Sequence, residues 1–318
     1  MVSLLHDDMV RHILSFVPLG FHMATRLVCK RWAGCLEAEG GTRSTASCHM
    51  GSLRLLRWAK EEGCPMDESV SKAAVERGDV VILDHLRSEG VPWSSDSYSA
   101  AAGNGHVHVL EWLKERRCPH TRWAMQMAVM DALRHGHLAV LLWVERNGMG
   151  EVDRHMCVVW AARYGHIRIL EWASHGGDSG RMMYSCACSA AANAGQLAAL
   201  QWLRGEGYEW SEHTCGSAAE GGHLSVLVWL RENGCPWDSL TTSWAARNGH
   251  IPVLEWAAGK GCELEESACE MAAATGRLEV LQWLRRHGCP WNRRTRQVAK
   301  ERGHPHVLEW AIENGCEE

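Results

Sequence analysis

One stretch recurs along most of the chain, and this repetition constrains the fold more than any other feature of the sequence. Each copy opens with a glycine, which most often precedes a histidine, and successive opening glycines stand 27 to 31 residues apart. A tryptophan follows seven residues later in every copy except the second, where His85 takes its place. The opening glycines are Gly51, Gly78, Gly105, Gly136, Gly165, Gly195, Gly222, Gly249, Gly276 and Gly303. The sequence therefore predicts ten copies of one structural unit.

Each copy predicts two short helices. The second helix begins after the Gly-His pair, because Pro252 and Pro305 fall in its first turn, where a missing backbone N–H costs little. It ends at a Gly-Cys-Pro turn, where Gly234 or Gly288 can adopt positive φ and the proline prevents continuation. The first helix starts after a capping residue and ends in paired alanines that let neighbouring helices approach closely. The predicted capping residues include Asp67, Ser94, Ser211 and Asp238.

The recurring motif resembles the ankyrin repeat. The shared residues are Ala-Ala-x-x-Gly-His-Leu-x-Val-Leu-x-Trp-Leu-x-x-x-Gly, over about residues 40–318. The period departs from the roughly 33 residues of that family, and Cys-Pro-Trp replaces its usual turn. We expect the missing residues to come from the β-hairpin that projects from ordinary ankyrin repeats. The resemblance implies an all-α, ankyrin-like helical-repeat solenoid of about ten helix pairs over residues 37–318, in which each copy is stabilised by its neighbours.

The fourteen cysteines predict free thiols. The chain contains no Cys-x-x-Cys motif, and the turn cysteines recur once per copy. Equivalent positions in packed helical copies lie roughly 10 Å apart, which exceeds the ~7 Å Cα separation that a disulfide tolerates. We therefore expect buried thiols in a reducing compartment. The turn cysteines are Cys64, Cys235, Cys262, Cys289 and Cys316.

Composition and motifs predict a binding protein that uses no cofactor or metal and is not an enzyme. The net charge of −5 offers no electrostatic footprint for nucleic acid, and neither a membrane span nor a signal peptide is expected. The recurring Gly-His histidine could suggest a metal site, but Asp79 and Gln196 occupy the same slot in other copies. That slot is therefore predicted to need polarity at a helix start. Catalytic motifs are missing from the sequence, and an enzyme with an unrecognised site stays as a third hypothesis. A cytoplasmic or nuclear location is expected.

Residues 1–36 lie outside the repeat and resemble an F-box. The resemblance rests on Ile-Leu-Ser-Phe-x-Pro-Leu at residues 13–19 and on Arg-Leu-Val-Cys-Lys-Arg-Trp at residues 26–32. His6 replaces the proline of the Leu-Pro pair that opens the motif in that family. The implied fold is a short N-terminal helical segment preceding the solenoid.

The F-box resemblance implies a partner, the Skp-family adaptor of a cullin–RING ubiquitin ligase. The remainder of the chain would then capture an unidentified target protein, and the chain is expected to be a monomer apart from these partners. The alternative is that residues 1–36 only cap the open end of the solenoid, and both roles can hold together. The implied adaptor-binding residues are Leu5, Ile13, Leu14, Pro18, Leu19, Leu27, Val28, Lys30, Arg31 and Trp32.

Three consecutive middle copies carry four, two and three additional residues, and they suggest where a target binds. Insertions in repeat proteins usually map to loops on one face, often the binding face. The alternative is variation of loops in solvent. The candidate target-binding residues near these insertions are Arg116, Arg117, His120, Arg122, Asp153, Arg154, His175, Asp178 and Arg181. The turn tryptophans Trp93, Trp210, Trp237 and Trp291 leave two hypotheses open, packing between turns or anchoring of a partner.

Overall fold

A computed structural model describes residues 66–94, 96–175 and 185–316, together with the isolated positions 53, 56, 57 and 60. All regular secondary structure within these ranges is helical. The chain divides into two compact units, residues 1–152 and 153–318, and each is described by itself. None of the helices in the described ranges combines the length and apolar character needed to span a bilayer.

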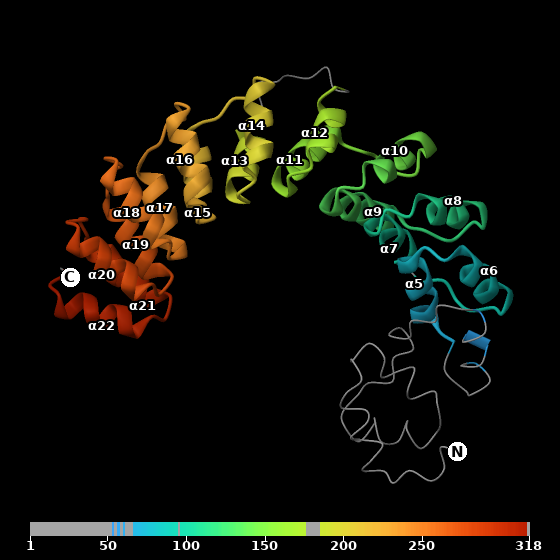
Figure 1. The fold of residues 1–318 in the computed structure, drawn as a ribbon. Helices are drawn as coiled ribbons and strands as arrows, with labels where there is room; N and C mark the ends of the chain where they lie inside the picture. The colour runs from blue at the N-terminus through green and yellow to red at the C-terminus, as the bar shows by residue number, and fades with distance from the viewer. Residues whose placement is uncertain are drawn as a thin grey trace, which may run out of the picture. The chain divides into compact units, whose positions relative to one another are not determined.

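The first unit contains three described helix pairs (Figure 1). The first helices of these pairs, α5, α7 and α9, contact one another in that order. Each first helix also packs on the second helix of its own pair, α6, α8 or α10. The bounds are α5 (Glu68–Arg77), α6 (Val80–Ser88), α7 (Ser97–Gly103), α8 (Val107–Glu115), α9 (Arg122–His135) and α10 (Leu138–Asn147).

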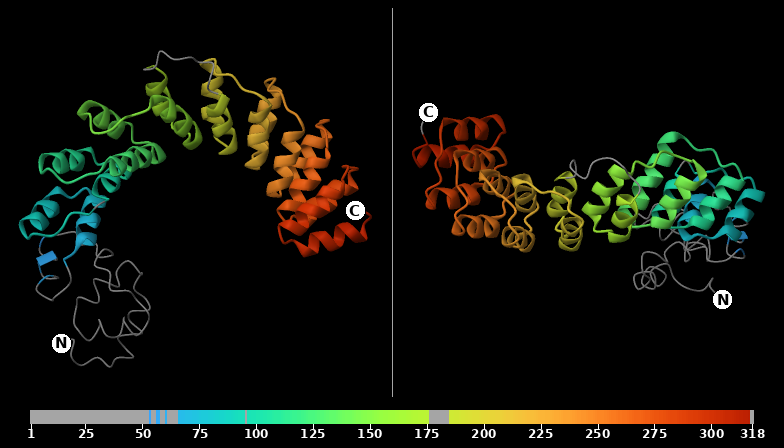
Figure 2. Two further views of the ribbon diagram at one scale, coloured as in Figure 1. Left: turned by 180° about the vertical axis from the view of Figure 1, so that it is seen from behind. Right: turned by 90° about the horizontal axis from the view of Figure 1, so that it is seen from above.

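The second unit repeats the same arrangement through six helix pairs. Its first helices stack side by side from α11 through α21, as Figures 1 and 2 show, and each packs on its own second helix. The bounds are α11 (Arg154–Tyr164), α12 (Ile167–Ser174), α13 (Ser185–Asn193), α14 (Leu197–Gly205), α15 (Glu212–Glu220), α16 (Leu224–Glu232), α17 (Ser239–Asn248), α18 (Ile251–Gly259), α19 (Glu266–Ala274), α20 (Leu278–Arg286), α21 (Arg293–Glu301) and α22 (Pro305–Glu313). The predicted stack of helix pairs is confirmed over the described residues.

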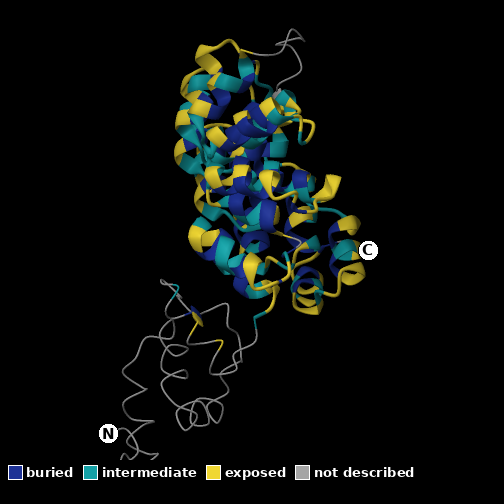
Figure 3. Cartoon of the chain, turned by 90° about the vertical axis from the view of Figure 1, so that its right-hand side faces the viewer, coloured by how far each residue is buried: buried dark blue, intermediate teal, exposed yellow. Residues whose placement is uncertain are grey.

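Small residues on the first helices allow this close stacking. The paired alanines Ala161-Ala162 and Ala218-Ala219 have no exposed surface, while the second helices contribute larger residues such as Leu227 and Leu254. Figure 3 shows buried residues along both rows of helices. The six residues 233–238 connect α16 to α17, and the described ranges contain no strand. The expectation of a short connection in place of a projecting hairpin is therefore confirmed for this turn.

The Gly-His pair locks consecutive copies together. His250 directs its Nε2 to the carbonyl oxygen of Glu220 at 3.0 Å, so the N–H donates across one copy. Its ring lies against Gly222, where an added Cβ would be 2.6 Å from the ring. His106, His137 and His304 make the same kind of bond. These histidines stand at the starts of their helices and use their polarity, as predicted, but their side chains bond to the preceding copy and make no capping bond to their own helix.

Two other expectations about helix ends need correction. Helix α7 begins at Ser97 and its N-cap is Asp96, whereas Ser94 instead accepts a bond from the backbone N–H of Asp96 through its hydroxyl. The four additional residues near position 120 lengthen α9 to 14 residues and leave a turn of ordinary length. The next insertion lengthens α10 and α11 to 10 and 11 residues. The third falls between Ser174 and Ser185, mostly outside the described residues.

The cysteines in the described ranges form no disulfide bond, as predicted, and all except Cys186 are buried. Each turn thiol also bonds to a backbone carbonyl of the preceding turn. Cys235 Sγ lies 3.4 Å from the Ser211 oxygen, and Cys262 Sγ lies 3.3 Å from the Asp238 oxygen. Burial raises the pKa of Cys262 to about 11. Cys64 lies outside the described residues.

We expect Trp112→Phe to destabilise the first unit by about 1 kcal/mol more than Trp143→Phe. The indole Nε1 of Trp112 donates to Asp84 Oδ1 at 2.9 Å, and this half-exposed, charged acceptor gives a bond of that order. Trp143 occupies the same slot in the next copy, but its buried Nε1 has no hydrogen-bond partner. Urea unfolding followed by far-UV circular dichroism measures both losses of stability. Equal losses for the two variants would show that the Asp84 bond contributes nothing.

Candidate functional site

The residues predicted to bind an adaptor, which run from Leu5 to Trp32, lie outside the described residues. The candidate site that the structure does describe is on the first unit. It consists of a pocket on the first helices and of an exposed tip at the start of α9.

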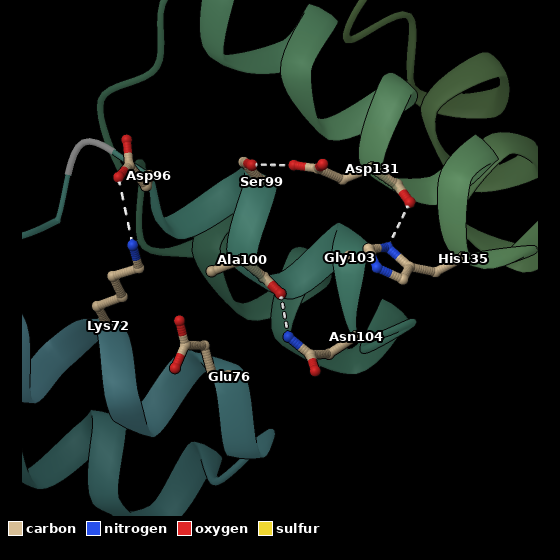
Figure 4. Close-up of a pocket in the computed structure, with 9 residues that line it drawn as sticks. All are labelled: Lys72, Glu76, Asp96, Ser99, Ala100, Gly103, Asn104, Asp131 and His135. Carbon is tan, nitrogen blue, oxygen red and sulfur yellow. Dashed lines mark hydrogen bonds and ion pairs between the residues drawn. The ribbon is translucent and has the colours of Figure 1, made fainter. Parts of the chain in front are cut away.

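The pocket has a volume of about 350 Å³ and opens on the row formed by α5, α7 and α9 (Figure 4). Seven of the nine residues that line it are polar or charged. The other two, Ala100 and Gly103, are small residues of α7. The lining residues are Lys72, Glu76, Asp96, Ser99, Ala100, Gly103, Asn104, Asp131 and His135.

One ion pair, one hydrogen bond between helices and hydrogen bonds within single helices hold polar side chains around the pocket. Lys72 Nζ lies 3.5 Å from Asp96 Oδ2, and the Ser99 hydroxyl donates to the Asp131 carboxylate. His135 Nδ1 donates to the backbone oxygen of Asp131 at 2.9 Å. The side chain of Glu76 is exposed and faces the same space (Figure 4). Three carboxylates and one ammonium give the lining a net charge of −2 with histidine neutral.

Three of the predicted target-binding residues stabilise the fold. Arg116 forms an ion pair of 2.6 Å with Asp84, the acceptor that also holds Trp112. Asp153 caps α11 by accepting bonds from two backbone N–H groups. Arg154 stacks on the ring of Trp172 at 4.1 Å and donates to its carbonyl at 2.7 Å. These contacts explain why the residues occur, independently of any target.

The other predicted target-binding residues lie in different environments. His120 packs edge-on against Tyr98, with ring centroids 5.2 Å apart. His175 lies at the C-terminal end of α12 and bonds to the backbone oxygen of Glu171. Arg117 and Arg122 are exposed. Asp178 and Arg181 lie outside the described residues. The structure thus brings Arg117, His120 and Arg122 together in the first unit, at the turn before α9 and at the start of that helix. Of the other predicted target-binding residues that the structure describes, Arg116 pairs with Asp84 on α6, and the rest belong to the second unit.

The tip of α9 comprises Arg122 and Trp123 at the start of that helix, together with Glu151 from the turn after α10. It contains a residue that sequence reasoning missed. Trp123 is 67% exposed, the largest exposed fraction among the large hydrophobic residues in the described ranges. Arg122 lies 3.6 Å from Glu151, and both side chains are more than four-fifths exposed. The insertion itself could have indicated that Trp123 is exposed. Its residues are good helix formers, so they extend α9 by about one turn, and Trp123 then lies beyond the core.

The turn tryptophans pack between copies. Trp237 stands edge-on to Trp256 with centroids 5.8 Å apart, and the Arg231 guanidinium lies 4.2 Å above its ring. Trp93, Trp210 and Trp291 repeat this arrangement with their own tryptophan and arginine neighbours. Of the two hypotheses left open by the sequence, packing between turns describes their contacts.

Arg117→Gly is expected to raise the free energy of unfolding by about 1 kcal/mol. Arg117 has φ of 53° at a turn position where the corresponding residue in other copies, such as Gly207 or Gly234, is glycine. A side chain in this left-handed region costs roughly 1–2 kcal/mol of stability. Glycine removes this cost, but it also gives the unfolded chain more conformational freedom, which offsets part of the gain. Chemical denaturation of the two proteins checks the sign. A variant less stable than the wild type would mean that Arg117 makes a contact that outweighs this strain.

Comparison with known proteins supports the assignment of the N-terminal segment. Residues 2–37 match the family model of the F-box domain, which confirms the F-box prediction. Among solved structures, the chain is similar to the crystal structure of the human ASB11 ankyrin repeat domain, at 16% sequence identity and a TM-score of 0.39. That match covers 51% of this chain and 84% of that chain. No curated protein matches the sequence. The residues that match the F-box model thus precede the stack of helix pairs in the chain.

Proposed function

We propose that this protein is a substrate receptor of an SCF-type cullin–RING ubiquitin ligase. The F-box match at residues 2–37 carries this proposal, because F-box domains dock on Skp-family adaptors. The helix pairs that follow offer exposed surface for a second protein. In this arrangement one end of the chain holds the ligase and the other part holds the target.

The receptor would act by proximity. A target bound to the helix pairs is held at a high effective concentration near the ligase, so that ubiquitin transfer to it becomes effectively intramolecular. The transfer chemistry belongs to the ligase, and this chain contributes binding and orientation only.

We propose that the target contacts the tip of α9 and the neighbouring pocket. Exposed tryptophan and arginine are the residue types that most often anchor protein interfaces, and Trp123 and Arg122 stand together at the tip. Asp131, on the same helix, lines the pocket eight residues further on, or about 12 Å along the helix axis. A single binding partner can therefore cover both features.

The adaptor interaction is tested by co-expression with a Skp-family adaptor, followed by gel filtration. The wild type is expected to form a stable complex, and the double variant Leu14→Asp plus Trp32→Ala is expected to form none. Both proteins should give the same helical circular dichroism. The exposed-site variant Trp123→Ala is the matched control, because it should bind the adaptor like the wild type.

Two outcomes would contradict the proposal. If the wild type does not bind the adaptor and the double variant loses helicity or solubility, residues 1–36 only cap the solenoid. If the adaptor binds but Trp123→Ala captures cellular proteins as well as the wild type, the tip of α9 is not the binding surface.

A further inference from the structure

Two buried thiols face each other in the helix pair formed by α19 and α20. Cys269 lies on α19, and Cys289 lies in the turn that follows α20. Their Sγ atoms are 3.4 Å apart, and neither side chain is exposed. Cys289 Sγ also lies 3.1 Å from the backbone oxygen of Glu265, so its position is fixed from two sides. The two cysteines are 20 residues apart in the sequence. Only Cys289 belongs to the turn cysteines, so the recurrence of those cysteines does not reveal the pair.

The repeat places the same two positions together in neighbouring pairs. Thr242 and Arg296 occupy the slot of Cys269, and each bonds to the turn that follows its own second helix, at Glu263 and Cys316 respectively. Cys215 occupies the same slot, and its Sγ lies 4.0 Å from the backbone oxygen of Cys235. The contact between this position of the first helix and the turn after the second helix thus recurs from pair to pair. The residue types at the two positions decide whether it is a hydrogen bond to the backbone or a contact between two thiols.

We propose that Cys269 and Cys289 form an oxidisable dithiol site that closes to a disulfide in the presence of a peroxide. The sulfur atoms need to approach only from 3.4 Å to about 2.05 Å. The resulting bond would join the first helix of the pair to the turn after its second helix. It would hold this part of the second unit against local opening.

The surroundings of the pair distinguish the two thiols. Cys269 donates its S–H to Cys289, and this bond, together with nearby Arg285, lowers the pKa of Cys289. The same bond, together with burial, raises the pKa of Cys269. Cys289 donates its own S–H to the Glu265 oxygen in the resting protein, and it is the thiol of the pair that loses its proton more readily. It then attacks as the thiolate, which is the nucleophilic form of cysteine.

The oxidation balances in two steps. The Cys289 thiolate attacks one oxygen of hydrogen peroxide, which breaks the O–O bond, forms a sulfenic acid and releases hydroxide that is protonated to water. The Cys269 sulfur then attacks the sulfenic sulfur, the S–S bond forms, and the hydroxyl group leaves with the Cys269 proton as a second water. Two thiols lose two electrons, and the peroxide gains them.

Access to Cys289 requires only a small movement of its turn. The adjacent residues Gly288 and Pro290 are both exposed, whereas the thiol itself is buried. Short exposed turns open locally without unfolding of the helices that they connect. Oxidation is therefore expected to be slow in the native protein and to be reversed by a dithiol reductant.

The experiment treats the full native chain with hydrogen peroxide, blocks the remaining thiols by alkylation and maps disulfides by mass spectrometry. Cleavage after Glu263, Glu265, Glu266 and Glu270 separates Cys262 from Cys269. A Cys269–Cys289 link that lacks two hydrogens and disappears on reduction is the expected result, with Cys262 alkylated as an internal control. Full alkylation of Cys269 and Cys289 after peroxide treatment, or a link from Cys289 to Cys262, would overturn the proposal.

Two variants borrow residues from neighbouring copies and so preserve the fold. Cys269→Thr installs the residue that stands at position 242 and should abolish the link. Thr242→Cys places a second thiol beside Cys262, and we expect a new peroxide-dependent link there. If the variant has the circular dichroism of the wild type but the new link does not form, these two positions of the repeat do not bring thiols into reactive contact.

Discussion

Gly222→Ala is expected to lower the free energy of unfolding by about 2–5 kcal/mol. Gly222 has φ of 74°, a conformation in which a side chain costs roughly 1–2 kcal/mol. Its new methyl group would also lie 2.6 Å from the ring of His250. That ring cannot turn aside freely, because its Nε2 donates to the backbone oxygen of Glu220. Overpacking of this kind costs a further 1–3 kcal/mol or so.

The matched control is Gly234→Ala in the same copy. Gly234 has φ of 81°, but an added Cβ there meets nothing within 4 Å. This variant should lose only the stability that corresponds to placing a side chain in the left-handed backbone conformation, roughly 1–2 kcal/mol. Urea unfolding followed by circular dichroism compares the two. If both variants lose the same stability, the contact between Gly222 and His250 does not limit the packing of successive copies.

Trp237→Ala is expected to cost about 3 kcal/mol, because it removes a half-buried ring from between two copies. The ring contacts Trp256 edge-on and lies under the guanidinium of Arg231. Each of these contacts contributes about 1 kcal/mol beyond the burial of apolar area. Trp237→Phe retains a ring in this space and should lose less than half as much.

Trp123→Ala serves as the reference for this prediction. Trp123 is 67% exposed, and loss of such a side chain usually changes stability by less than about 0.5 kcal/mol. Thermal and urea unfolding of the three variants gives the ranking directly. A Trp237→Ala protein as stable as Trp123→Ala would mean that the turn tryptophans are free for a partner and do not hold the copies together.

Much of the fold could be predicted because the signals are local. Positive φ at Gly234 and Gly288 follows from the requirement of a helix end, which glycine meets without steric cost. The N-caps Asp67 and Asp238 follow from the same local chemistry. The placement of the four additional residues near position 120 was wrong. Residues such as Ala124, Met125 and Gln126 are good helix formers, so the insertion lengthened α9.

The candidate site was only partly predictable. Arg117 and Arg122 are exposed as expected, but Arg116 and Arg154 hold the fold through Asp84 and Trp172. The sequence marks a charged side chain in a turn, yet it does not show which neighbour that side chain reaches. Trp123 escaped notice for the opposite reason, since tryptophan is usually part of the core in this repeat.

The sequence by itself determined the period, the helix pairs and the F-box at the start of the chain, because each depends on residues close together in the chain. The tertiary structure alone decided which residues far apart in the chain meet. His250 reaches Glu220 from 30 residues away, and Cys269 reaches Cys289 from 20 residues away. Such meetings depend on how helices rotate and slide against one another, within a pair and between pairs. This is set by the packing of whole side chains and not by local backbone preference.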